Sequence, residues 1–110
     1  MKLSLPTTLL CGCAAIAALL TAPLAQASEA IVKKARCVAC HTVDAKRVGP
    51  AYKDVAEKYK GNAGAAGKLF DKVRNGGSGI WGDVPMIPHD ASKISDEDLK
   101  AAIQWILSLD

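Results

Sequence analysis

The chain has 110 residues, which is enough for at most one domain. Its 14 Lys and Arg residues outnumber its 11 Asp and Glu residues by only three, and no basic cluster is interleaved with aromatic residues. The composition therefore gives no support for nucleic-acid binding.

The first 27 residues have the pattern of an export signal. Lys2 gives a positive start, residues 9–20 form an apolar run, and Ala25-Gln26-Ala27 matches a small-x-small cleavage site. We expect cleavage after Ala27, a mature domain at residues 28–110 and a periplasmic location. Two alternatives are an uncleaved anchor, although roughly 20 apolar residues are needed to span a bilayer, and lipoprotein processing at Cys13.

Helical periodicity predicts four helices, at residues 28–36, 52–60, 65–74 and about 95–108. Ser28 and Ser95 are the candidate N-caps of the first and the last. The apolar face of the third helix is predicted to contain Ala66, Leu69, Phe70 and Val73. No segment has the pattern of a strand, so the sequence predicts an all-α fold. Residues 76–90, rich in Gly and containing two Pro residues, are predicted to be a long irregular segment of functional importance.

The stretch Cys37-Val38-Ala39-Cys40-His41 reads C-x-x-C-H, the attachment signature of a c-type haem. Cysteines at this spacing can each bond a vinyl-derived carbon of one porphyrin, and His41 can then ligate the iron. Two other interpretations are a redox dithiol and a Cys2His2 zinc site completed by His89. Zinc is disfavoured because Cys40 and His41 are adjacent, which is awkward for one tetrahedral ion.

The residue that fills the sixth position on the iron decides the function. Met86 is the one methionine of residues 28–110, and it lies between Pro85 and Pro88. A thioether ligand favours ferrous iron and an electron carrier of raised potential. The alternatives are a packing role for Met86, ligation by His89, which we otherwise predict to be a surface residue, and an open position that permits ligand binding or peroxide chemistry.

Supporting groups follow from what a haem requires. The carbonyl of Pro50 is the candidate acceptor for the second ring N–H of His41. Trp81, Lys72 and Arg74 are candidate donors to the two propionates, with packing or solvent exposure as the alternative roles.

Several stretches together resemble the small bacterial class I cytochromes c of the c-551/c-552 group. They are Cys37 to His41, Val48-Gly49-Pro50-Ala51-Tyr52-Lys53-Asp54-Val55-Ala56, Asn75-Gly76, Gly79-Ile80-Trp81-Gly82, Pro85-Met86 and Trp105-Ile106-Leu107-Ser108. The resemblance implies about four short helices around one covalent haem c, with the N- and C-terminal helices crossing.

The resemblance also implies roles for single residues: thioether attachment by Cys37 and Cys40, axial ligation by His41 and Met86, and supporting contacts from Pro50, Lys72 and Trp81. The chain departs from the family pattern at Lys72, where arginine is frequent. It departs again at Ile87-Pro88-His89, where Pro-Pro-Asn is frequent.

The function implied is that of a monomeric electron carrier, not an enzyme, without membrane insertion of the mature chain. Its partners would be a quinol-oxidising complex as donor and a terminal reductase or oxidase as acceptor. We expect lysines around the haem edge to steer acidic partner surfaces, namely Lys33, Lys34, Lys46 and Lys53.

Overall fold

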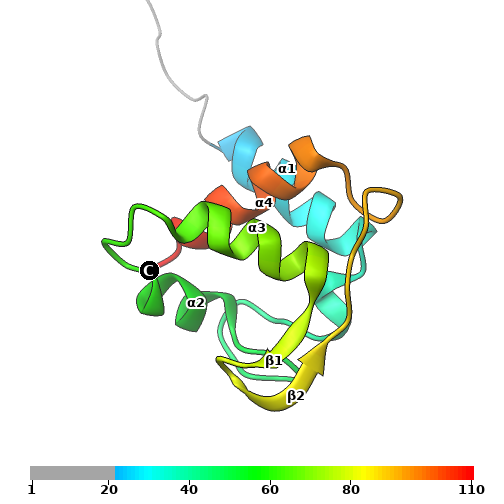
Figure 1. Ribbon diagram of the computed structural model, residues 1–110. Helices are drawn as coiled ribbons and strands as arrows, with labels where there is room; N and C mark the ends of the chain where they lie inside the picture. The colour runs from blue at the N-terminus through cyan, green and yellow to red at the C-terminus, as the bar shows by residue number, and fades with distance from the viewer. Residues whose placement is uncertain (1–21) are drawn as a thin grey trace, which may run out of the picture.

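The computed structural model describes residues 22–110, so residues 1–21 of the predicted export signal lie outside the described part. Four α-helices pack together with a small β-hairpin at one edge of the molecule (Figure 1), and a 3-10 turn, η1, follows the first helix. The elements are α1 (Ala22–Lys34), η1 (Cys37–Ala39), α2 (Tyr52–Lys58), α3 (Ala65–Asn75), β1 (Gly77–Gly79), β2 (Gly82–Met86) and α4 (Asp96–Leu107). The predicted, mainly helical fold is confirmed. No helix within residues 22–110 is long and apolar enough to cross a bilayer.

Helix α4 is the centre of the packing, because it contacts α1, α2 and α3. Its buried face contains Leu99, Ala102 and Ile103, and the core cluster that includes Leu99 and Ile103 extends to Ala35 and Ile94. The predicted N-cap at Ser95 is confirmed: its Oγ accepts a hydrogen bond from the N–H of Asp98 at 3.1 Å. The cap satisfies one of the free N–H groups in the first turn.

Helix α1 begins at Ala22, six residues before the predicted start. Ser28 therefore lies within the helix, where it is buried, and the prediction that it caps the helix is wrong. The reason is that the Ala, Leu and Gln residues that precede Ser28 are good helix formers, and that Pro23 lies in the first turn, where proline is tolerated.

The segment predicted to be irregular contains the antiparallel hairpin of β1 and β2, with Gly77 opposite Met86 and Gly79 opposite Gly82. Gly77, Gly79 and Gly82 all have positive φ, a backbone conformation that residues with a side chain rarely adopt. The hairpin therefore depends on its glycines. Pro85 fits in β2 because both strands of a two-stranded hairpin are edge strands.

Helix α3 lies against the core through Leu69, Phe70 and Val73, as predicted. Its first turn differs from the prediction: Ala66 is exposed and Ala65 is buried. Ala65, Leu69 and Val73 are spaced four residues apart, so they form one stripe along the helix. Ala66 lies outside the edge of that stripe.

Candidate haem-binding site

The two cysteines of the C-x-x-C-H motif lie in one tight turn. The N–H groups of Cys40 and His41 both donate to the carbonyl of Cys37, each at 3.0 Å. Both thiols are free and half-buried. Burial, together with the neighbouring Cys40, raises the pKa of the Cys37 thiol. Dithiol redox centres depend on a lowered thiol pKa, so this environment does not favour the dithiol interpretation.

The chain enters this turn through Arg36, whose φ is 63°. It is the one non-glycine residue with positive φ in the described part of the chain. A left-handed conformation brings Cβ close to the carbonyl oxygen and is strained for such a residue. The strain accompanies the sharp change of direction between α1 and η1.

The His41 ring is held by the loop that follows the motif. Its Nδ1 lies 2.7 Å from the carbonyl oxygen of Pro50. A carbonyl only accepts, so Nδ1 carries the hydrogen and donates it, which leaves the lone pair on Nε2 free to bind a metal. On one side the Gly49 backbone is so close that a Cβ there would lie 2.4 Å from His41 Cε1. The Tyr52 ring stacks on the imidazole at a centroid distance of 5.4 Å.

Backbone hydrogen bonds close this loop onto the motif. The N–H of Gly49 donates to the carbonyl of Cys40 at 2.8 Å, and the N–H of Tyr52 donates to that of Thr42 at 2.9 Å. Because the loop returns to its own start, the Pro50 carbonyl is placed beside His41 by short-range contacts.

Tyr52 packs in the interior between the motif and α4, with its ring edge-on to Trp105 at 5.8 Å. Its hydroxyl is buried and has no hydrogen-bond partner. Burial, with a smaller contribution from Cys37, raises the pKa of Tyr52 well above its ordinary value. The hydroxyl therefore stays protonated at any physiological pH.

Met86 is half-buried at the end of β2. Its backbone packs against Gly76, the C-cap residue of α3. A Cβ on Gly76 would lie 2.4 Å from the carbonyl oxygen of Met86 and 2.9 Å from the nitrogen of Pro88. Glycine with positive φ is therefore required where α3 meets the strand that carries Met86.

Large apolar side chains are exposed in three segments of residues 22–110: the motif, the loop after it, and residues 80–87. They are Val38, Val48, Ile80, Trp81, Val84 and Ile87, between 38% and 65% exposed. Apolar surface of this kind commonly marks a binding site. Together with two free thiols and an imidazole with an available Nε2, it fits a large, flat, apolar cofactor such as haem.

Lys72 and Trp81 lie near the hairpin. Lys72 is half-buried, and its Nζ is close to Gly77, where a Cβ would be 3.5 Å away. Lys72 also lines a shallow hollow beside the start of the hairpin, with Tyr59, Lys68, Asp71, Asn75, Gly76 and Ile80. Trp81 is 38% exposed and lies under the ammonium group of Lys58, 5.3 Å from the ring centroid.

Two sequence predictions about polar residues are wrong. Arg74 is neither solvated nor available to a propionate, because its guanidinium donates to the carbonyls of His89 and Ile94 and pairs with Asp96. His89 is not a surface residue: it is buried, with Nδ1 2.8 Å from the carbonyl oxygen of Ile87. Both errors have one cause, since α3 ends against the segment that contains His89.

The zinc interpretation finds no support in the structure. Within residues 22–110, no three His, Cys, Asp or Glu side chains are grouped so that they could hold a metal ion.

Of the lysines expected around a haem edge, Lys33, Lys34 and Lys46 are exposed, whereas Lys53 is paired with Asp44 at 2.9 Å.

Sequence reasoning missed Gly49 and Tyr52 as residues that hold His41. The adjacency of Gly49 and Pro50 was a usable signal, because a glycine beside a ligand-orienting carbonyl permits close backbone approach. Tyr52 carried no such signal, since its position on the apolar face of a helix fits ordinary core packing equally well.

A family model described as Cytochrome c matches residues 25–110. Cytochrome c-552 of Nitrosomonas europaea is 48% identical over 98 residues, which cover 89% of this chain and 93% of that protein. Cytochrome c-551 of Pseudomonas aeruginosa is 45% identical over 84 residues, which cover 76% of this chain and 78% of that protein.

Solved structures agree with the sequence relatives. The crystal structure of Nitrosomonas europaea cytochrome c552 matches with a TM-score of 0.69 and 46% identity, covering 74% of this chain and 99% of that chain. The class 1 cytochrome MtoD of Sideroxydans lithotrophicus matches with a TM-score of 0.66 and 36% identity, covering 76% and 92% of the two chains. The fold is therefore that of the class I cytochromes c. The chain belongs to the cytochrome c family, as a small electron-transfer haem protein whose cofactor is covalent haem c.

Proposed function

We propose that this chain is a periplasmic one-electron carrier, with its haem attached through Cys37 and Cys40 and ligated by His41 and Met86. The observation that carries this assignment is the 2.7 Å contact between His41 Nδ1 and the Pro50 carbonyl, which leaves Nε2 available to iron. Bound between a histidine and a methionine, haem iron takes up and releases one electron at a raised potential.

Lys72 and Trp81 are the candidate donors to the haem propionates. Lys72 supports this role because the residue is half-buried and its ammonium group lies beside Gly77 at the base of the hairpin. Trp81 lies in the same hairpin and has an indole N–H, which only donates. Arg74 is not included, because His89, Ile94 and Asp96 already occupy its guanidinium.

The carrier role, in place of catalysis, rests on Met86, since a thioether on the sixth position leaves no room for a substrate. We propose export by the signal at residues 1–27 and a monomeric mature chain at residues 28–110. Its donor would be a quinol-oxidising complex and its acceptor a terminal reductase or oxidase. The free cations Lys33, Lys34 and Lys46 would steer acidic partner surfaces.

Visible spectra test the ligand set. The wild-type ferric protein should be low-spin, with the weak far-red charge-transfer band of methionine-ligated haem. Met86→Leu should lose that band, become high-spin and bind carbon monoxide when reduced. Asp83→Asn, an exposed change in the same strand, should retain the band. A wild-type protein that is high-spin and binds carbon monoxide would instead establish an open sixth position.

Mass spectrometry of the exported protein tests the processing. The expected mass is that of residues 28–110 plus one haem, and neither Cys37 nor Cys40 should react with a thiol reagent. Reactive thiols and a polypeptide mass without haem would contradict the proposed attachment.

A further inference from the structure

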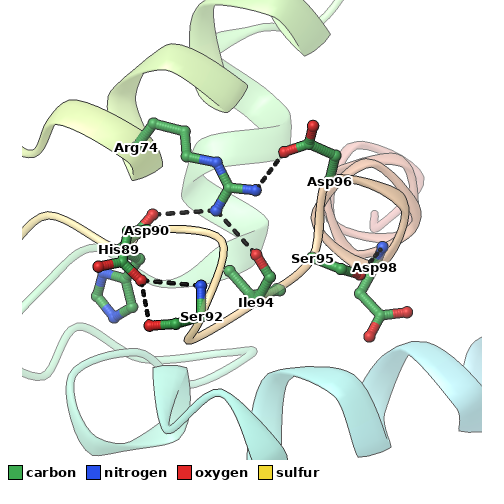
Figure 2. Close-up of polar contacts among 8 residues, drawn as sticks. All are labelled: Arg74, His89, Asp90, Ser92, Ile94, Ser95, Asp96 and Asp98. Atoms are coloured by element: carbon green, nitrogen blue, oxygen red, sulfur yellow. Dashed lines mark hydrogen bonds and ion pairs between the residues drawn. The ribbon is translucent and has the colours of Figure 1, made fainter.

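Arg74, in the last turn of α3, reaches across to the connecting segment, residues 87–95, which joins β2 to α4. Its Nη1 donates to the carbonyls of His89 at 3.0 Å and Ile94 at 2.9 Å, and its Nη2 lies 2.5 Å from Oδ1 of Asp96. Figure 2 shows these bonds spreading from one guanidinium to the connecting segment and the start of α4. One side chain therefore ties three points of the chain to α3.

We infer that Arg74 is a positioning residue for the sixth ligand: by fixing the connecting segment, it keeps Met86 at the iron. This inference rests on the proposed function, in which Met86 ligates the haem. Arg74 contacts neither Met86 nor the cofactor in this role. It acts through the connecting segment, which follows Met86 in the chain and leads to α4.

The backbone from Met86 to His89 has a second attachment to the same turn of α3. The N–H of His89 donates to the carbonyl of Val73 at 2.9 Å, and Gly76 packs directly against the carbonyl of Met86. The His89 bond also satisfies one of the carbonyls left free at the end of a helix. The side chain of Arg74 adds its hydrogen bonds to these backbone contacts. Val73, Arg74 and Gly76 together therefore hold one short stretch of backbone.

The geometry requires an arginine. The side chain of Arg74 is only 16% exposed, and its planar fork donates to three acceptors at once. A lysine has a single ammonium group and cannot reproduce that fork. The guanidinium also lies 5.1 Å from the Phe70 ring centroid, which fixes it further. Its charge lies at the C-terminal end of α3, and that of Asp96 at the N-terminal end of α4, so both helix dipoles favour the pair.

Apart from the Ser95 cap of α4, the remaining polar contacts of the connecting segment are local to it. Asp90 accepts from the N–H and the hydroxyl of Ser92, and Lys93 reaches the carbonyl of Pro88 at 3.4 Å. Such contacts shape the segment without attaching it to α3. Loss of Arg74 should therefore loosen the part of the segment that follows Met86, with the His89 N–H bond to Val73 and the buried side chains of His89 and Ile94 as the remaining attachments.

The test compares three variants of the holoprotein. Arg74→Met removes all three bonds, Arg74→Lys keeps the charge without the fork, and Asp96→Asn weakens only the ion pair. The control is Lys53→Met, which breaks the exposed pair with Asp44 on another part of the surface. The first measurement is the rate at which imidazole replaces methionine on the ferric iron. The second, independent of the haem, is hydrogen exchange at the His89 N–H.

Arg74→Met should speed imidazole binding by about tenfold or more, because hydrogen bonds from a charged donor are among the strongest. The His89 N–H should lose protection by a similar factor. Arg74→Lys should fall between Arg74→Met and wild type, Asp96→Asn should have a smaller effect than either, and Lys53→Met should behave as wild type. If Arg74→Met does not accumulate as holoprotein, Arg74→Lys carries the same comparison.

Unchanged imidazole binding in the Arg74 variants, with a normal charge-transfer band in the wild type, would overturn the inference and leave the proposed function intact. A lower melting temperature without faster ligand exchange would give Arg74 a structural role only, and would also overturn it. A wild-type protein without methionine ligation would overturn the proposed function and this inference together.

Discussion

Gly49→Ala is the sharpest test of how His41 is held. The added Cβ would lie 2.4 Å from Cε1, 2.9 Å from Nδ1 and 3.0 Å from Nε2 of the His41 ring. The φ of Gly49 is not in the positive region, so alanine suits the backbone and the effect is purely one of space. The imidazole or the loop must move by roughly the ångström that separates this contact from ordinary van der Waals distance.

The magnitude follows from two contributions. Overpacking a fixed site costs about 1–3 kcal/mol. Movement of the ring also breaks the Nδ1 hydrogen bond to Pro50, which adds about 1 kcal/mol. The sum of about 2–4 kcal/mol should lower the melting temperature by about 10 °C or more in a domain of this size.

Thermal unfolding of the ferrous holoprotein, followed by circular dichroism, measures this change. Gly67→Ala is the matched control: a Cβ there has no neighbour within 4 Å, and the residue lies inside α3. That variant should gain up to about 1 kcal/mol, because alanine favours helix over glycine. The same Gly→Ala substitution should thus lower the melting temperature at position 49 and raise it at position 67. If Gly49→Ala melts at the wild-type temperature, the close contact with His41 does not hold the ring.

Three further predictions concern single residues. Arg36→Gly should raise the urea midpoint by the equivalent of about 0.5–1 kcal/mol, because relief of the left-handed strain outweighs the added chain entropy; a lower midpoint would contradict the strain at φ 63°. Tyr52→Phe should leave the melting temperature unchanged or raise it, because the buried hydroxyl has no partner to lose; a clear drop would reveal a hydrogen bond. Ser92→Ala should raise the pKa of Asp90, measured by NMR titration, since the Ser92 hydroxyl and N–H hold that pKa below its ordinary value. A lowered folded-state pKa stabilises the fold above the unfolded pKa, and the benefit disappears as pH falls through the folded one, so the variant should be less stable than wild type at neutral pH and equal to it in strong acid; equal titration curves would refute the assignment.

Local patterns in the sequence predicted the helices well. The stretch from residue 95 to 108 has a serine cap, acidic residues in its first turn and an apolar stripe, and all three features belong to α4 in the structure. The C-x-x-C-H motif is equally local, because its spacing alone brings Cys37, Cys40 and His41 into one turn. Interactions within one turn of chain depend little on the rest of the fold.

The environments of Arg74 and His89 could not be predicted in this way. His89 is buried because the connecting segment lies against the end of α3, and nothing near position 89 in the sequence encodes that contact. Arg74 was equally ambiguous, since its three acceptors lie 15 to 22 residues further along the chain. The hairpin was missed because its glycines and its one proline, Pro85, disfavour strands by propensity, and the positive φ angles that make it possible are a property of the folded backbone.

The central position of α4 has a consequence for how the protein is made. This helix packs on α1, α2 and α3, and the core cluster joins Ala35 of the first part of the chain to Ile94, Leu99 and Ile103 of the last. A ribosome-bound chain that has not reached α4 lacks the partner for every other helix. Contacts so distant in sequence also require closure of a long loop before they stabilise anything. The polypeptide should therefore remain unfolded until synthesis reaches α4, and an unfolded chain is the form that can thread through an export channel.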